Sequence, residues 1–455
     1  MSDTPFANHR LCALWAQEKT RFEQSHTRSM ALSQAAQAHF LFGVPLHWMR
    51  DWPTPGTLFV QSAQGCRLRC VDGHDYRDFC LGDTGAMFGH SPPALVEALA
   101  RQLPLGLTSM LPAANTAAVG TLLAERFGLP YWQLALSASD ANRFVLRWAR
   151  AITGRDQVLV FDGCYHGAVD DTLVDLDPAR GQTLRRPSVL GQVHDHHRHT
   201  RVVPFNDLAA LANALADGRV AALLAEPALT NCGLVPPQAG FWPAAQALCQ
   251  AHGTLLVLDE THTLSSGPGG WARQQGLQPD LLVIGKAVAG GLPCAVYGAS
   301  AAVAERMVAS KQAAPPGHSG IGTTLTANAL TLAALEAALQ QLHTPATYGP
   351  MLAAADRLEA GLNAALQAHR RPWTVTRLGA RMELQFMPET PQDAQAVRAH
   401  HDEGMTALMH LYLLNRGIVL TPFHDMMLCS AATTDADVDR LLAVLNEWLD
   451  ALDGA

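Results

Sequence analysis

Short apolar runs alternate with longer Ala- and Leu-rich stretches through the middle of the chain. Most of these runs lack alternating polar positions, so the strands that they predict are apolar on both faces, as in a parallel sheet covered by helices. Between two runs, residues 140–154 predict a helix with its apolar side chains on one side. The alternation predicts an α/β fold with a mainly parallel central sheet flanked by helices. The strands are predicted at 157–163, 219–227, 253–260, 279–286 and 294–300.

The two ends of the chain have a different pattern. Residues 59–82 predict short antiparallel strands around a turn at Asp72 and Gly73. After about residue 345 the pattern predicts helices interleaved with strands at 373–386 and 417–422. We therefore expect a smaller α+β domain built from both ends. The expected division is 1–95 for the N-terminal part of the small domain, 96–345 for the large domain and 346–455 for the C-terminal part of the small domain.

Composition excludes several classes of protein and leaves an enzyme open. The 455 residues are 48% hydrophobic and 16% charged, which is typical of a globular chain with an ample core. The net charge of −8 favours neither nucleic acid nor an anionic membrane as a partner. The N-terminus lacks the apolar core of a signal peptide, and no apolar run is long enough to span a membrane. The nine scattered cysteines indicate free thiols, so we expect a cytoplasmic protein.

Charged side chains close two neighbouring predicted strands. Asp259 and Glu260 end the run Leu-Leu-Val-Leu, and Lys286 ends the next run. In open parallel sheets, ligands bind outside the carboxyl ends of the strands, so Asp259 and Lys286 should face one site. A buried lysine can act as a Schiff-base nucleophile, whereas a strand-end lysine can simply reach solvent. Asp259 could instead cap a helix, and Glu260 could only fix the backbone.

The chain offers, in order, the four groups that pyridoxal phosphate (PLP) requires. The cofactor needs a phosphate cradle at a helix start, a group that stacks on its ring, a carboxylate for its pyridine nitrogen and a lysine for its aldehyde. A packing role in a turn stays open for the stacking candidates. The four groups are Ser137, Ala138 and Ser139; Tyr165 and His166; Asp259; and Lys286.

Seven segments in a fixed order give the chain a specific resemblance. It resembles the class III (fold type I) PLP-dependent aminotransferases over about residues 43–449, nearest to the branch of glutamate-1-semialdehyde aminomutase and β-amino-acid transaminases. The segments are DGHDYRDFCLGDTGAMFGHSPP, GCYHG, AEPALTNCGLVPP, DETHT, GKAVAGGLP, HSGIGTTLTANAL and LLNRGIVLTP.

The resemblance implies roles for single residues. Lys286 forms the internal aldimine and moves the Cα proton, Asp259 pairs with the pyridine nitrogen and Tyr165 stacks on the ring. Glu226 lies beside the site. Thr261 falls where the family often has a valine against the other ring face, and His262 falls next to the cofactor phenol oxygen. The phosphate contacts that it implies are Ser137, Ala138 and Ser139 and, from the neighbouring subunit of a homodimer, Thr324. Thr324 and Thr326 could instead only cap a helix over 326–342.

The chain departs from the family pattern in two places. The cradle reads SASDA, where the family usually has Ser-Gly-Thr-Glu-Ala, so a Cβ is added near the phosphate. The late loop 421–430 lacks the arginine that often binds a substrate carboxylate in this branch. Other cations could bind an anion such as a carboxylate or phosphonate, although salt bridges to Asp51 or Glu383 are the alternative. These candidates for substrate binding are His47, Arg50, Arg381 and His424.

We therefore predict a PLP-dependent aminotransferase that acts on a small amino compound through a Lys286 aldimine and a quinonoid intermediate. The alternatives are an ammonia-lyase acting on a β-hydroxylated amino acid or aminophosphonate, and an aminomutase or racemase. A non-catalytic binding module would not need Lys286 and Asp259 together. We predict no metal site, and we interpret the His-rich segment 193–199 as a solvated loop. We expect a homodimer with shared cofactor sites; the sequence does not define the substrate.

Overall fold

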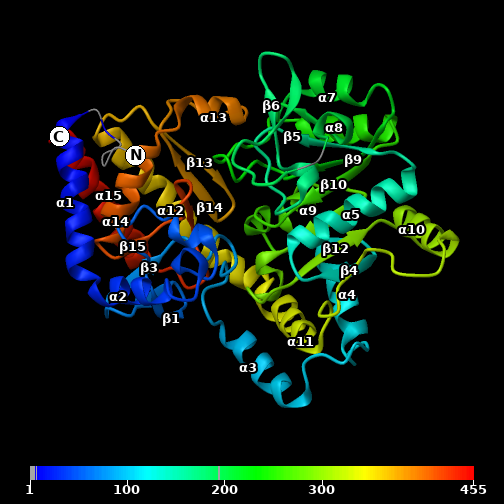
Figure 1. The fold of residues 1–455 in the computed structure, drawn as a ribbon, viewed down its shortest axis with the longest axis horizontal. Helices are drawn as coiled ribbons and strands as arrows, with labels where there is room; N and C mark the ends of the chain where they lie inside the picture. The colour runs from blue at the N-terminus through cyan, green and yellow to red at the C-terminus, as the bar shows by residue number, and fades with distance from the viewer. Residues whose placement is uncertain (1–5, 7, 193–194, 455) are drawn as a thin grey trace.

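A seven-stranded sheet forms the larger part of the molecule (Figure 1). The computed structural model describes residues 6, 8–192 and 195–454. The strand order is β4-β12-β11-β10-β9-β5-β8, and pairing is parallel from β11 to β8. The strands are β4 Tyr131–Ala135, β5 Gln157–Phe161, β8 Thr200–Val203, β9 Val220–Ala225, β10 Leu255–Asp259, β11 Leu281–Ile284 and β12 Ala295–Ala299.

The five strands predicted for this sheet are all present, which confirms the α/β class. The sheet is mainly parallel, as predicted, and β12 is the exception, since it runs antiparallel to both β11 and β4. The connection from Ile284 to Ala295 is too short to contain the crossover that parallel neighbours need. The strands β4 and β8 were not predicted. The sequence of β4, YWQLA, mixes aromatic and polar residues because this strand lies at the sheet edge and is largely accessible.

Helices cover both faces of the sheet and form two separate apolar cores. One core packs α5 (Ala138–Thr153) and α10 (Ala301–Ala313) against the sheet. The helix predicted over 140–154 is α5. The opposite face carries four helices, whose buried leucines and aromatic side chains form the second core. They are α4 Thr116–Phe127, α7 Leu208–Leu215, α8 Phe241–Ala251 and α11 Ala329–Ala337.

The two ends of the chain meet in a second region, where N and C lie on the same side of the molecule (Figure 1). A four-stranded sheet has the order β1-β2-β3-β15, and its last pair joins Arg77 to Ile418 in parallel. A three-stranded sheet, β13-β14-β16, lies in the same region (Figure 1). The shared sheet agrees with a small unit built from both ends, and the boundaries at 95 and 345 stay predictions. The strands are β1 Val60–Gln64, β2 Arg67–Cys70, β3 Asp75–Asp78, β13 Thr374–Leu378, β14 Arg381–Gln385, β15 Ile418–Val419 and β16 Met426–Leu428.

The remaining elements complete the two regions. None of the helices in the described part of the chain is long and apolar enough to cross a membrane. The outer helices are α1 His9–Ser25, α2 Thr27–Ala36, α3 Pro93–Gln102, α12 Pro345–Ala368, α13 Ala394–His400, α14 Glu403–Leu414 and α15 Asp435–Asp453. Shorter elements are α6 His196–His199, α9 Gly270–Gln274 and the hairpin of β6 Val174–Asp177 with β7 Gln182–Arg185.

A buried carboxylate links the N-terminal sheet to the C-terminal helix. Asp437, in the first turn of α15, accepts hydrogen bonds from Thr434 and contacts Arg67 and Arg77 of β2 and β3 at 2.5 and 3.0 Å. Burial alone would raise the pKa of Asp437, but the hydrogen bonds from Thr434 and Cys66 and the charge of Arg67 lower it overall. The contribution of Asp437 to stability is therefore present above about pH 3.9, the pKa of an unfolded aspartate, and is lost as the pH falls through the lower folded-state pKa.

We expect Asp437→Ala to lower the free energy of unfolding by about 2 kcal/mol or more, because it removes a helix cap and two charge-assisted contacts. Chemical denaturation of both proteins at neutral pH measures this loss. Asp439→Ala is the matched control, since Asp439 lies on the same helix and pairs with Arg357 at the surface. Equal stabilities of the two variants would contradict the assignment.

Candidate active site

A cavity of about 380 Å³ opens at the carboxyl ends of the central strands, where the sequence predicted a site. The end of β10 and the segments after β5, β9 and β11 form its walls, together with the start of α5. Every predicted cofactor-binding residue except Thr324 lines this cavity. The topology therefore brings together side chains that are up to 149 positions apart, from Ser137 to Lys286.

Asp259 closes the strand β10 as a buried carboxylate with three donors. Its Oδ2 accepts from Asn142 at 2.8 Å and lies 3.0 Å from His166 Nδ1, and its Oδ1 accepts from the Thr261 amide at 3.1 Å. Burial would raise the pKa of Asp259, but the hydrogen bond and charge of His166, with the bonds from Thr261 and Asn142, lower it. Asp259 is therefore anionic at neutral pH in a site that excludes most water.

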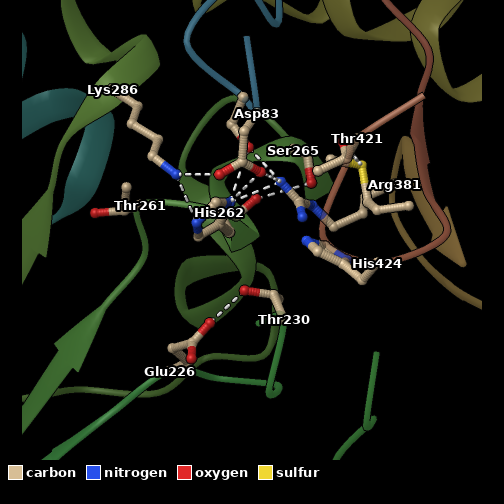
Figure 2. A network of polar contacts seen from close by, with 12 residues as sticks. Asp83, Glu226, Thr230, Thr261, His262, Ser265, Lys286, Arg381, Thr421 and His424 are labelled. Atoms are coloured by element: carbon tan, nitrogen blue, oxygen red, sulfur yellow. Dashed lines mark hydrogen bonds and ion pairs between the residues drawn. The ribbon is translucent and has the colours of Figure 1, made fainter. Parts of the chain in front are cut away.

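Two further titratable groups lie on the floor of the cavity. Burial would lower the pKa of His166, but its hydrogen bond to Asp259 raises that pKa to about 10, so His166 is a cation. Burial raises the pKa of Glu226 to about 7. Glu226 accepts hydrogen bonds from the Thr230 hydroxyl and, at 3.4 Å, from the Tyr165 amide (Figure 2). Tyr165 itself lines the cavity and is partly exposed, at 39%.

The first turn of α5 presents backbone donors to the cavity. Ser137 caps the helix and accepts from the Asp140 amide at 3.2 Å, so the amides of Ala138 and Ser139 have no partner within the helix. The Ser139 hydroxyl oxygen accepts from the Ala168 amide at 3.0 Å, which leaves its own proton free to donate. The Cβ of Ala138, where the family usually has glycine, lies beside Gly285; a Cβ built on Gly285 would come within 2.7 Å of it.

The amine of Lys286 belongs to a polar cluster in which Asp83 and His262 lie between it and Arg381 (Figure 2). Its Nζ donates to Asp83 Oδ2 at 2.7 Å and lies 2.8 Å from His262 Nε2. Burial would raise the pKa of Asp83, but the cations Lys286 and Arg381 and the nearby His262 hold it well below its usual value. Asp83 is therefore an anion that faces the lysine directly.

Arg381 enters the same cluster from β14 of the other region (Figure 2). It is almost fully buried, its Nη2 donates to the Thr84 hydroxyl and to His262 Nδ1, and it lies 3.8 Å from Asp83 Oδ1. The ion pair of Arg381 with Asp51 or Glu383, which the sequence left open, is replaced by the pair with Asp83. Glu383 contacts His424 at 3.1 Å instead, and the pKa of His424 is raised despite burial because of that carboxylate.

Five predicted site residues do not line this cavity: Arg381 and His424, which belong to the neighbouring cluster (Figure 2), and His47, Arg50 and Thr324. His47 and Arg50 lie on the surface, in a short helical turn at His47–Arg50. Thr324 is also exposed, in the segment before α11. The alternative that Thr324 or Thr326 caps a helix over 326–342 was wrong: α11 begins at Ala329, and the side chain of Asn328 caps it.

Glu260 has the structural role that the sequence left open for it. Its carboxylate accepts from the Trp271 and Ala272 amides at 2.9 and 2.6 Å and from the Thr263 hydroxyl at 2.6 Å. It anchors the start of α9. In the His-rich segment, residues 193 and 194 lie outside the described residues, and Asp195 caps the short helix α6. Among the described residues no group of three or more His, Cys, Asp or Glu side chains could hold a metal ion.

The sequence did not single out Asp83, Thr84 and Asn142. Asn142 lies within the helix predicted over 140–154, and Asp83 lies within one of the segments that carry the family resemblance. Neither residue could be assigned a role from the sequence. Asp83 and Thr84 have φ angles of 48° and 82°, which glycine adopts more readily. A carboxylate and a β-branched residue next to Gly82 in an otherwise apolar, glycine-rich segment were the available signal.

Comparisons with known proteins agree with this geometry. The family model "Aminotransferase class-III" matches residues 49–445. A curated relative, the glutamate-1-semialdehyde 2,1-aminomutase of Anaeromyxobacter sp. (strain K), is 34% identical over 394 residues, which cover 85% of this chain and 89% of the relative.

Solved structures share the whole fold. The crystal structure of a glutamate-1-semialdehyde aminomutase from Pseudomonas aeruginosa PAO1 is similar, with a TM-score of 0.95 and 47% identity over 97% of this chain and 98% of that chain. A lysine-to-alanine variant of a glutamate-1-semialdehyde aminomutase from the same organism, in complex with PMP, is 46% identical with the same TM-score and coverage.

Proposed function

Because the chain belongs to the class III aminotransferases, a family of fold type I PLP-dependent enzymes, we propose that it transfers an amino group on a small amino compound that carries an anionic group. The observation that carries the proposal is the position of the Lys286 amine, 2.7 Å from Asp83 and 2.8 Å from His262 at the edge of a cavity that Asp259 lines. The names of the curated relatives support transfer between neighbouring carbons of one molecule, as in an aminomutase.

The residues of the cavity fit PLP. The unpartnered amides of Ala138 and Ser139, the Ser139 hydroxyl and the positive end of the α5 dipole suit a phosphate. Gly285 leaves room beside Ala138, so the extra Cβ of the cradle does not block it. The anionic Asp259 suits a protonated ring nitrogen, and Tyr165 is placed to cover the ring.

Each side chain then has a task that follows from its surroundings. Bound PLP supplies a ring that withdraws electrons from the substrate carbon when its nitrogen is protonated. Asp259 holds that proton, and His166 and Asn142 hold Asp259 in place. Lys286 takes and returns a proton at Nζ, while Asp83 and His262 orient this atom.

Arg381 is the best placed cation for a substrate anion. Its Nε and Nη1 are buried and have no hydrogen-bond partner among the described residues, which is costly unless a ligand supplies acceptors. His424, beside Arg381 in Figure 2, adds an imidazole whose pKa is raised by Glu383 despite burial. His47 and Arg50 are exposed and do not take part within one chain.

Elimination of ammonia is the second candidate, and Glu226 is the observation that favours it. With a pKa of about 7, part of the Glu226 population carries a proton at neutral pH inside the cavity. Such a carboxyl group could protonate a leaving group on the carbon next to the amine.

Three assays on purified enzyme separate the possible reactions. We expect candidate substrates to be converted to an isomer without any keto acid and without release of ammonia. A product that forms only with a keto-acid acceptor would indicate transfer between molecules. Ammonia without an acceptor would indicate the lyase and contradict the proposal.

Lys286→Ala should retain the fold and lose both turnover and the visible absorption of bound cofactor. The chain has the further lysines Lys19 and Lys311, so Lys311→Ala on the surface helix α10 is a matched control that should behave as wild type. A Lys286→Ala protein with the wild-type rate would refute the assignment of this residue.

Asp259→Asn should fold and lose at least tenfold in kcat, which corresponds to about 1.4 kcal/mol of transition-state stabilisation. A neutral amide cannot stabilise a cationic ring nitrogen, and its NH2 group would face the donors Asn142 and His166. The control is Asp217→Asn, since Asp217 is half-exposed and pairs with Arg201 away from the cavity. Stopped-flow or steady-state kinetics of both variants test this assignment. Retention of more than about a tenth of wild-type kcat would mean that Asp259 lacks this role.

We also propose a homodimer that completes the site. Apolar side chains are exposed on segment 103–111 and on Leu325, next to Thr324, and the Ala329 amide bonded to Leu107 at 2.9 Å joins the two segments. An apolar surface of this kind marks a protein contact. In a dimer Thr324 could reach the phosphate of the other subunit. The most exposed residues of the patch are Leu103, Leu105, Met110 and Leu111, and Leu325 is exposed to nearly the same extent as Leu103.

A homodimer with shared sites predicts that a variant that cannot dimerise also loses PLP. We expect Met110→Asp with Leu111→Asp to give monomers by light scattering and to release PLP on dialysis. Leu190→Asp should remain dimeric, although Leu190 is even more exposed, because it lies outside this patch. A stable monomer with stoichiometric cofactor would exclude the shared site.

A further inference from the structure

His262 has a cationic donor on one ring nitrogen. Arg381 Nη2 lies 2.7 Å from His262 Nδ1, and the guanidinium group carries N–H donors and no acceptor. Two N–H groups cannot face each other at this distance, so Nδ1 must accept. Asp83 Oδ1 is 3.8 Å from Nδ1, too far to take a proton from it by a hydrogen bond.

The ring of His262 therefore carries its single proton on Nε2. Burial holds the pKa of His262 well below its usual value, so the ring is neutral. The charges of Asp83 and Asp259 act in the opposite direction without outweighing this effect. A neutral imidazole that accepts at Nδ1 must donate at Nε2.

The donor at Nε2 points at the Lys286 amine. The distance from Nε2 to Nζ is 2.8 Å, and Nζ donates in turn to Asp83 at 2.7 Å. An amine nitrogen that keeps a lone pair can accept from His262 while one of its N–H groups donates to Asp83, so the two contacts suit that form of the amine. When Nζ takes up a further proton, the lone pair is gone and only the contact with Asp83 remains favourable. His262 and Asp83 together therefore interact differently with the unprotonated and the protonated amine.

We propose that Arg381 is a positioning residue, which fixes His262 as the Nε2–H tautomer so that His262 and Asp83 hold the Lys286 amine between one fixed donor and one fixed acceptor. The proposal deepens the proposed function and rests on the role of Lys286 in it.

The backbone conformation of residues 81–84 supports this proposal. Leu81, Gly82, Asp83 and Thr84 all have positive φ angles, of 47°, 57°, 48° and 82°. Left-handed conformations at non-glycine residues cost free energy and persist where the surroundings require them. Here they bring Asp83 to Nζ and place the Thr84 hydroxyl 2.9 Å from His262 Nδ1, where it adds a second contact to the nitrogen that must accept.

Nitrogen NMR of the holoenzyme labelled with ¹⁵N-histidine tests the tautomer directly, with His262→Gln used to assign the signal. We expect a protonated Nε2 and an unprotonated Nδ1 at His262, and Arg381→Met should give a mixture of tautomers. A wild-type signal with the proton on Nδ1, or a doubly protonated ring, would overturn the proposal. Wild type is sufficient for this outcome, so it does not depend on folding of the Arg381 variant.

A double-mutant cycle tests whether Arg381 acts through His262. The readout is the pH midpoint of the visible absorption of bound PLP. Arg381→Met should raise the midpoint by about one pH unit, because a bare Nε2 lone pair favours the protonated nitrogen. In a His262→Leu background the same change should shift the midpoint by much less. His262→Gln, whose amide can donate to Nζ and whose carbonyl can accept from Arg381, should stay near wild type.

Two controls separate this proposal from its alternatives. Arg377→Met removes an arginine near β14 whose partners are Asp356 and Glu359, so the midpoint should not move. Equal shifts from Arg381→Met in both backgrounds would mean that Arg381 acts by its charge alone and would refute the proposal. If visible absorption of the holoenzyme does not depend on Lys286 at all, the proposed function itself fails; if it does and the cycle is additive, only the tautomer assignment fails.

Discussion

The site depends on one carboxylate, Asp83, that joins Lys286 and Arg381. Asp83 contacts Lys286 and lies near Arg381, with the neutral ring of His262 between them. Each of these charges alone would be costly to bury, so they are stable only as a set. The three members come from three parts of the chain: the segment after β3, the end of β11 and β14. The charge balance therefore fixes how the small region sits against the large sheet.

That balance requires an unusual backbone. Asp83 reaches Lys286 only because the chain adopts left-handed angles from Leu81 to Thr84, and Lys286 itself has a φ of 46°. The backbone strain is therefore concentrated at Asp83 and at Lys286, the two residues whose side chains meet at Nζ. The stable β10 carboxylate Asp259 needs no such distortion, since an ordinary strand end and three donors hold it. One half of the site is thus rigid scaffold and the other half is held by electrostatic attraction.

This contrast explains what could be predicted from the sequence. Strand runs such as 253–260 and strand-end residues such as Asp259 and Lys286 follow from local patterns, and parallel topology gathers them. The partners Asp83 and Asn142 could not be assigned, because their roles depend on distant contacts that no local periodicity encodes. Arg381 was noticed as a charge in an apolar strand, but its partner Asp83 was not, since Glu383 lies on the same strand and Asp83 is far away in the sequence. The antiparallel direction of β12 could not be predicted, because an apolar run does not indicate the direction of its strand relative to its neighbours.

The pairing of β3 with β15 has a consequence for the order in which the protein is made. The strands of the central sheet lie between Tyr131 and Ala299, so this sheet can form while the rest of the chain is still being synthesised. The N-terminal strands emerge first, yet their edge at Arg77 must wait for Ile418. Arg381 is also translated late. A nascent chain therefore carries the carboxylate of Asp259 early, and the cluster around the amine of Lys286 is complete only after Arg381 has been translated.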